Sequence, residues 1–225
     1  MKFIKYGITL HLLKEADIEL VRQWRNDPSV VRNYEFREYI TPEMQKEWFK
    51  SIYNNNNIYL VIEYEGQKIG VVNAKDVDLV KGTVESGIFI PDGKYSQTFL
   101  PGLVMITTVE LGFRMFGFKH GYAHILKSNA SVRSIARSFG YELCADQENE
   151  ENQLYEITKE RFEVKAAKLI KAMYTITGNQ DAGKIIIERS EMDDEVVIGW
   201  EDLVRKNGPI LNIEETPEER IYQLF

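Results

Sequence analysis

The stretch from Val84 to Gly140 decides the fold. It begins with VESGIFI at 84–90, passes through a polar segment, and continues with GLVMITTVELGFRMF at 102–116, GYAHIL at 121–126 and NASVRSIARSFG at 129–140. Apolar runs of strand length alternate here with segments of helical period, which is typical of a β-α-β-α unit. Both helices begin in polar or glycine-containing loops just after strands, and such N-termini present free N–H groups to an anion. The pattern predicts a small-molecule site between the two strand ends.

Composition narrows the class of protein. The 225 residues are 44% apolar and 12% aromatic, enough for a core and for one domain with an appendage or two small domains. A net charge of −7 argues against a broad nucleic-acid surface. The single cysteine, Cys144, excludes an internal disulfide framework and indicates a reducing compartment. No apolar run has the length of a secretory signal or a membrane span, so we expect a cytoplasmic protein without a membrane contact.

The rest of the chain predicts a mixed α/β fold. We expect helices at 15–25, 29–34, 101–116 and 129–139, and strands at 4–12, 58–64, 68–74 with a continuation at 76–80, 83–90, 121–127, 141–144 and 154–158. A further helix should begin at Thr41-Pro42-Glu43 and bury Met44, Trp48, Phe49 and Ile52.

From about residue 160 the pattern of predicted strands and helices changes. A helix at 162–174, a loop at 175–183, a strand at 184–189 and a short helix at 200–206 precede a charged end that we expect to be mobile. We therefore divide the chain into a domain at 1–160 and a C-terminal extension at 161–225 with no assigned role.

The order of elements resembles that of the GCN5-related N-acetyltransferases (GNAT). The resemblance is carried by Ser128-Asn129-Ala130-Ser131 opening the last core helix, Phe139-Gly140-Tyr141 ending it, Trp24-Arg25-Asn26-Asp27-Pro28, KIGVV at 68–72 and ESGIFI at 85–90. It covers about residues 6 to 160. The likeness is greatest to the branches that acetylate ribosomal-protein N-termini or nucleotide-linked amino sugars. It implies a mixed, mostly antiparallel central sheet flanked by helices, and acetyl-CoA as co-substrate.

The resemblance also implies where acetyl-CoA would lie. The pantetheine arm would run beside the backbone of Ile88, Phe89 and Ile90, with Asn129 and Ser131 in contact with it, and the pyrophosphate would lie by Gln97, Thr98, Pro101 and Gly102. The family's phosphate loop is usually Gln/Arg-x-x-Gly-x-Gly/Ala. This chain has QTFLPG at 97–102, which keeps one glycine, places Phe99 near the phosphates and loses one N–H donor to proline.

The reaction needs a neutral amine, a polarised thioester carbonyl and a proton for the leaving thiolate. In the ribosomal-protein branch the base lies five positions before the asparagine, and that position here is His124, whose ordinary pKa suits the role. Glu85 on the neighbouring strand is the other candidate base, acting directly or through water. The family's tyrosine acid corresponds to Ala136, which leaves Tyr141, Tyr95 or water as alternatives. Arg25, Asn26 and Tyr122 would line the acceptor side.

The sequence thus predicts an acetyl-CoA-dependent N-acetyltransferase that acts on a primary amine of a small molecule, with a nucleotide-linked amino sugar preferred. A protein N-terminal acetyltransferase and a non-catalytic GNAT-like assembly module are the alternatives. The three histidines, His11, His120 and His124, show no metal-ligand spacing, so no metal site is expected. The chain could form a homodimer.

Overall fold

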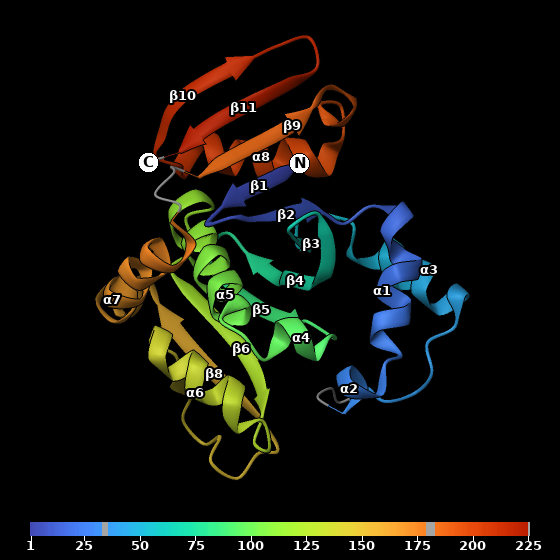
Figure 1. The fold of residues 1–225 in the computed structure, drawn as a ribbon, viewed down its shortest axis with the longest axis vertical. Helices are drawn as coiled ribbons and strands as arrows, with labels where there is room; N and C mark the ends of the chain where they lie inside the picture. The colour runs from blue at the N-terminus through green and yellow to red at the C-terminus, as the bar shows by residue number, and fades with distance from the viewer. Residues whose placement is uncertain (33–35, 179–182, 225) are drawn as a thin grey trace.

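The computed structural model describes residues 1–32, 36–178 and 183–224 (Figure 1). Its strands are β1 Lys2–Lys5, β2 Ile8–Leu12, β3 Ile58–Tyr64, β4 Gln67–Asp78, β5 Thr83–Phe89, β6 His120–Leu126, β7 Glu142–Leu143, β8 Asn152–Thr158, β9 Lys184–Glu188, β10 Ile210–Glu215 and β11 Glu219–Leu224. Its helices are α1 Ile18–Arg25, α2 Pro28–Val31, α3 Pro42–Ile52, α4 Gly93–Ser96, α5 Leu100–Glu110 with the π-helix η2 Leu111–Met115, α6 Ala130–Phe139, α7 Lys159–Thr177 and α8 Glu195–Asn207, and two 3-10 turns lie at Glu15–Asp17 and Arg189–Glu191.

These strands form one sheet in the order β10-β11-β9-β1-β2-β3-β4-β5-β6-β8-β7. Neighbouring strands pair antiparallel except β5 and β6, which are parallel. The predicted mixed, mostly antiparallel sheet flanked by helices is therefore confirmed.

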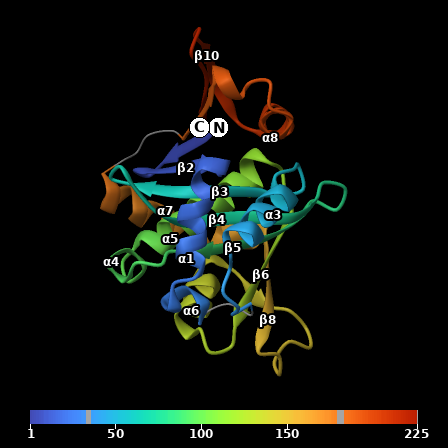
Figure 2. The ribbon, with the colours of Figure 1, turned by 90° about the vertical axis from the view of Figure 1, so that its right-hand side faces the viewer.

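Helices cover the two faces of the sheet unequally. The larger core lies on the face covered by α5, η2, α6, α7 and α8, where residues such as Leu103, Ile106 and Trp200 are almost fully buried. On the other face α1 and α3 pack over the middle strands around Val21, Val61 and Val71 (Figure 2). In the described part of the chain, no helix is both long and apolar enough to cross a bilayer.

Local capping explains several helix ends. The Thr41 side chain accepts a hydrogen bond from Met44 N at 3.2 Å, and Pro42 follows at the first helical position, as the sequence predicts. Asn129 caps α6 in the same way through Val132 N. Gly140 ends α6 with a φ of +104°, a conformation that glycine adopts without strain.

Some predictions for the N-terminal part of the chain are wrong. Met44 is 41% exposed, whereas Gln45 is buried and accepts from Arg25 Nη1 at 3.0 Å. The strand expected at 4–12 is two strands joined at the Tyr6–Gly7 turn. The strand expected at 68–74 with a continuation at 76–80 is confirmed as the single strand β4, which ends at Asp78. The helix at 101–116 changes to a π-helix after Glu110, and α4 lies in the segment read as a polar loop.

The prediction of a mobile C-terminal end is wrong as well. This end forms β10 and β11, and β9 attaches the hairpin to the rest of the sheet by pairing Ile185 with Phe3. The expected helix at 200–206 is the longer α8, which packs Trp200 against Phe116 with ring centroids 4.7 Å apart. The helix expected at 29–34 ends at Val31, and residues 33 and 34 of that prediction lie outside the described residues. The helix α7 continues to Thr177, into the loop expected at 175–183, of which residues 179–182 lie outside the described residues.

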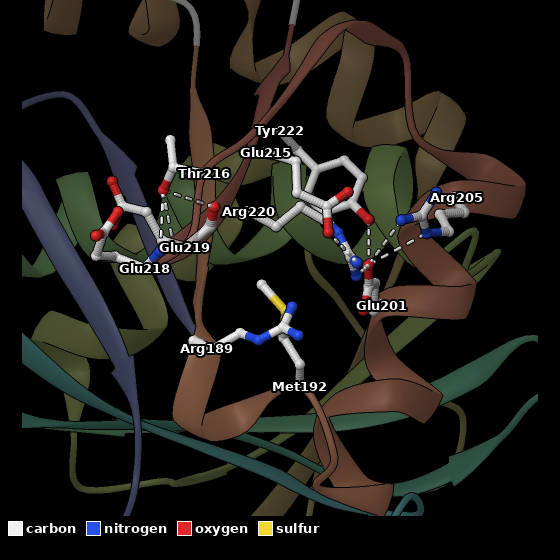
Figure 3. Close-up of polar contacts among 10 residues, drawn as sticks. All are labelled: Arg189, Met192, Glu201, Arg205, Glu215, Thr216, Glu218, Glu219, Arg220 and Tyr222. Carbon is white, nitrogen blue, oxygen red and sulfur yellow. Dashed lines mark hydrogen bonds and ion pairs between the residues drawn. The ribbon is translucent and has the colours of Figure 1, made fainter.

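A polar cluster ties α8 to the last strand (Figure 3). The Glu201 carboxylate on α8 accepts hydrogen bonds from Tyr222, from Arg220 Nη1 at 2.8 Å and from Arg205 Nη2 at 3.0 Å. Glu215 on β10 bonds the other end of the Arg220 guanidinium at 2.8 Å. The cluster joins three elements that are all distant in sequence from the central stretch.

Candidate active site

The sheet opens between β5 and β6. The two strands pair only at Thr83↔His120, Val84↔Gly121 and Glu85↔Tyr122. Beyond these pairs β5 stays with β4 as far as Phe89, and β6 stays with β8 as far as Leu126. The facing backbone edges of residues 86–89 and 123–126 therefore do not pair with each other. A slender ligand can hydrogen-bond to these edges as a strand would.

The two helices that follow these strands begin beside this opening. Gly102 is the third residue of α5, so its N–H has no partner within the helix. A Cβ at Gly102 would meet only Phe139 Cζ, at 3.9 Å, so side chains leave this backbone accessible. Phe99 at the N-cap makes no side-chain cap and is 39% exposed. The start of α5 thus retains an N–H donor and the positive end of its dipole for an anion.

The other residues expected near a phosphate have local roles as well. Thr98 Oγ1 accepts from Leu100 N at 3.2 Å and donates to Tyr95 O at 2.6 Å. Gln97 follows α4, and its N–H donates to Gly93 O at 3.2 Å. Pro101 occupies the second position of α5, where the absent N–H breaks no helical hydrogen bond.

At the start of α6, Asn129 Oδ1 accepts from Val132 N at 3.2 Å, and Ser131 is exposed at the second helical position. The cap uses the carboxamide oxygen of Asn129.

His124 and Glu85, the two candidate bases, meet across the opening. His124 Nδ1 lies 3.0 Å from Glu85 Oε1, although the two residues belong to strands that no longer pair at His124. The His124 side chain is 41% exposed and that of Glu85 is 20% exposed, so solvent reaches the pair. Val84 on β5 points toward α5, and successive side chains of a strand point to opposite faces of the sheet. Glu85, and with it His124, therefore lies on the face opposite α5.

Lys75 completes a row of three side chains across β4, β5 and β6. Its Nζ lies 3.0 Å from the same Glu85 oxygen that faces His124. Burial alone would lower the pKa of the Lys75 ammonium, but the hydrogen bond and the charge of Glu85, with a further contribution from Asp76, outweigh burial and raise it. Lys75 is therefore a permanent cation beside Glu85.

A second histidine–glutamate pair lies at the start of β6, where β5 and β6 are still paired. His120 Nδ1 lies 2.8 Å from Glu156 Oε1, Tyr122 Oη donates to the same oxygen at 3.2 Å, and Arg161 Nη2 bonds the other oxygen at 2.9 Å. Burial, aided by the charge of Glu156, raises the pKa of the Tyr122 phenol. Tyr122 is thus engaged with Glu156.

Of the three residues expected on the acceptor side, Tyr122 lies on β6, whereas Arg25 and Asn26 lie at the end of α1. Arg25 bonds Gln45 Oε1 and lies over the Trp48 ring at 4.7 Å. Asn26 donates to Ile40 O at 2.9 Å and accepts from Ile40 N at 2.8 Å, so its amide fastens the chain before α3 to the end of α1. Phe89 on β5 contacts Trp24 of α1 edge-on, with centroids 6.5 Å apart, which brings α1 to the end of β5.

A sequence model described as the acetyltransferase (GNAT) domain matches residues 8–142, well over half of the chain. The chain belongs to this family. As a GNAT enzyme it is an N-acetyltransferase that takes its acetyl group from acetyl-CoA.

Solved structures share the GNAT fold of this chain. A domain from Methanocaldococcus jannaschii DSM 2661 is 22% identical, with a TM-score of 0.59 over 67% of this chain and 97% of that one. Spermidine N-acetyltransferase from Vibrio cholerae in complex with CoA and spermine is 15% identical, with a TM-score of 0.62 over 71% and 99%. FdhC, a nucleotide-linked sugar GNAT, is 20% identical, with a TM-score of 0.64 over 76% and 97%. A search of the curated proteins finds no match.

The two tyrosines that the sequence left as candidate proton donors, Tyr141 and Tyr95, have different surroundings. Tyr141 Oη lies 3.2 Å from Ser86 Oγ, and Ser86 is the first β5 residue beyond the last pair with β6. Burial raises the pKa of Tyr141, so its phenol keeps its proton. Tyr95 instead donates to Gln67 at 2.6 Å. Burial also raises the pKa of the Cys144 thiol, which fits a thiol that is not a nucleophile.

Sequence reasoning missed Lys75 and Ser86 as parts of this site. Lys75 could have been found as an oppositely charged cross-strand neighbour of Glu85, but only with the correct register of β4 and β5. Ser86 carried no signal beyond its place in the strand. Within the described residues no group of three or more His, Cys, Asp or Glu side chains is arranged to hold a metal ion.

Proposed function

We propose that this enzyme acetylates a primary amine of a small molecule, with a nucleotide-linked amino sugar as the preferred acceptor, and that His124 and Glu85 remove the amine proton. The observation that carries this proposal is the His124–Glu85 pair at the point where β5 and β6 part. Acetyl-CoA supplies an activated acyl group, and its arm would follow the unpaired edge of β5 along Ile88, Phe89 and Ile90. Its pyrophosphate would lie at the start of α5 by Gly102.

The pair assigns different tasks to its members. Nδ1 of His124 faces Glu85, so Nε2 is the ring nitrogen available to an incoming amine. Glu85 orients the imidazole and stabilises it once it carries the proton, while Lys75 holds Glu85 in position from the other side. Tyr141 is the better placed of the two tyrosines to return a proton to the thiolate, because it lies beside the opening.

The charges around the pair support a small acceptor over a basic peptide. Glu85 is matched by Lys75, and Glu156 is matched by Arg161. Carboxylates paired in this way do not form the acidic groove that would draw a basic N-terminus. Arg25, at the end of α1, supplies a guanidinium on the side where an anionic nucleotide would lie.

The first test is a screen of amine acceptors, with release of free CoA thiol as the readout. We expect turnover with a nucleotide-linked amino sugar and little with peptides that carry a free N-terminus. Turnover with peptides alone would favour the protein N-terminal acetyltransferase. If acetyl-CoA at millimolar concentration does not raise the melting temperature, the non-catalytic module gains support and the proposal fails.

The second test removes the pair. His124→Ala and Glu85→Gln should each lower kcat by about 10²- to 10⁴-fold without a matching change in the KM for acetyl-CoA. His120→Ala and Glu156→Gln are matched controls, since they alter the same kind of pair on the same strand, away from the opening. We expect both controls to keep kcat within a few-fold of wild type. Undiminished rates in His124→Ala and Glu85→Gln would contradict the mechanism.

Two other features stay predictions. A homodimer is one, and a related spermidine N-acetyltransferase from Vibrio cholerae has a dodecameric structure.

The domain boundary after residue 160 is the other prediction. The extension from 161 to 225 contributes β9, β11 and α8 to the same sheet and core, so we propose that it stabilises the GNAT domain through β1.

A further inference from the structure

An apolar cavity of about 50 Å³ lies between the sheet and the second half of α5 with η2. Val84, Ser86 and Gly121 line it from the strands, and Thr108, Gly112 and Phe116 line it from the helix. Nearly all of its other lining side chains are apolar, so it suits hydrocarbon better than water, which needs several polar partners.

Small residues keep this space open. A Cβ at Gly121 would lie 3.0 Å from Ile157 Cγ2, and one at Gly112 would lie 3.3 Å from the Phe118 ring. Ala74, the cross-strand neighbour of Ser86, contributes only a methyl group to the lining. The π-helix η2, which continues α5, also forms part of the cavity wall.

The cavity borders the opening between β5 and β6 at Ser86. Ser86 is the first residue past the last pair between β5 and β6, and it also lines the cavity. An arm that starts at Gly102 and follows β5 from Ile90 to Ile88 arrives at Ser86 with its thioester end. Glu85 and His124 are on the opposite face of the sheet, so an amine would approach from one face while the acyl chain points to the other.

We propose that this cavity receives the carbon chain of acyl groups longer than acetyl, so that the enzyme also transfers propionyl and butyryl groups from their CoA thioesters. This rests on the proposed use of the opening by a CoA thioester. The amine nitrogen forms a bond to the thioester carbonyl carbon, and the C–S bond breaks with its electron pair going to the CoA thiolate. The proton that the amine loses passes to His124, and the thiolate takes up one proton, so no oxidant or reductant is needed.

Burial of one further methylene group in an apolar site is worth about a fourfold change in an equilibrium constant. We therefore expect kcat/KM to rise by about fourfold from acetyl-CoA to propionyl-CoA and again to butyryl-CoA, and to fall for octanoyl-CoA, whose chain exceeds the cavity. Initial rates of thiol release with one fixed amine measure this series. Calorimetric Kd values for CoA, acetyl-CoA and butyryl-CoA give a readout that does not depend on turnover.

Filling the cavity supplies the decisive comparison. Ala74→Val and Ala74→Leu should remove the preference for butyryl-CoA stepwise while acetyl-CoA turnover stays within about threefold of wild type. Ala167→Leu, at an exposed position on α7, is the matched control and should leave the acyl series unchanged. Ala74→Val keeps the test valid if the larger variant does not fold, because valine is well suited to a strand.

The two ways of failing are distinct. If no CoA thioester binds, the proposed function is wrong and this inference falls with it. If acetyl-CoA binds and turns over but rates and affinities drop from acetyl to butyryl, only the acyl cavity is overturned. Equal effects of the Ala74 variants and of Ala167→Leu on every donor would likewise overturn the acyl cavity alone.

Discussion

Replacing Glu201 with glutamine tests how the C-terminal strands are held to the GNAT domain. The Glu201 side chain is 7% exposed and receives hydrogen bonds from Tyr222, which is fully buried, and from two arginines (Figure 3). Glutamine keeps the volume and one acceptor oxygen but removes the charge. Arg220, whose side chain is 20% exposed, then loses a carboxylate on its buried side.

The expected loss of folding free energy is about 2 kcal/mol. Removing one partner of a fully buried ion pair costs about 3–5 kcal/mol, and an exposed pair is worth about 0–1 kcal/mol. The ion pair of Glu201 with Arg220 is partly buried, so its contribution lies between these two values. Arg205 is 43% exposed, so its pair with Glu201 contributes about as much as an exposed pair. For a chain of this length, a loss of about 2 kcal/mol lowers Tm by about 4–8 °C.

The pH dependence gives a sharper test. Burial alone would raise the pKa of Glu201, but the hydrogen bonds from Tyr222, Arg220 and Arg205 outweigh it and hold the pKa below its usual value. A carboxylate of this kind stabilises the fold fully above its unfolded pKa and ceases to do so as the pH falls through the lowered value. The difference between wild type and Glu201→Gln should therefore be constant near neutral pH and shrink below about pH 4.

Urea denaturation at several pH values measures that difference. Glu215→Gln is the matched control, because Glu215 binds the same arginine from the exposed side and should change stability little. A difference of less than about 0.5 kcal/mol at pH 7, or one that is equal at pH 7 and pH 3, would refute this explanation of how β11 is held.

Three further predictions concern the central site. Lys75→Met should lower kcat about fivefold by freeing Glu85, with Lys75→Arg restoring it, and an unchanged kcat would show that Lys75 has no positioning role. Asp76 has a φ of +53°, so Asp76→Val should cost about 1–2 kcal/mol in urea denaturation while Asp76→Gly costs less; equal midpoints would contradict this. Asn129→Ala removes the cap bonded to Val132 and should cost about 1 kcal/mol, whereas Asn129→Asp should keep most of it; Tm values distinguish the two.

The elements predicted correctly from the sequence are those fixed by local signals. Asn129 and Gly140 mark both ends of α6 because the cap bond and the left-handed C-terminal residue depend on a few neighbouring atoms. The parting of β5 and β6 followed from the resemblance to the GNAT family, since no local pattern specifies where two strands stop pairing. The contact between His124 and Glu85 was not predicted, because the two residues were named only as alternative bases on neighbouring strands.

Features that depend on register or distant pairing could not be predicted. Asp78 pairs with Thr83, and continuing that register would place Asp76 opposite Glu85. A register shift between Lys75 and Asp78 places Lys75 there instead, and the sequence gives no sign of it beyond an aspartate that can adopt a positive φ. The strand β9 was expected, but β10 and β11 were missed, because their hairpin joins the sheet only through β9, whose other partner β1 lies at the opposite end of the chain.

Hydrogen–deuterium exchange with and without acetyl-CoA tests most directly whether the opening between β5 and β6 receives the thioester. Ligand binding should slow exchange of the amides in residues 86–90 and at Gly102, because the arm and the pyrophosphate would occupy the unpaired strand edge and the start of α5. Exchange in β10 and β11, far along the sheet, should be unchanged. If acetyl-CoA binds but leaves 86–90 and Gly102 unprotected, the thioester binds elsewhere on the protein and the proposed site is wrong.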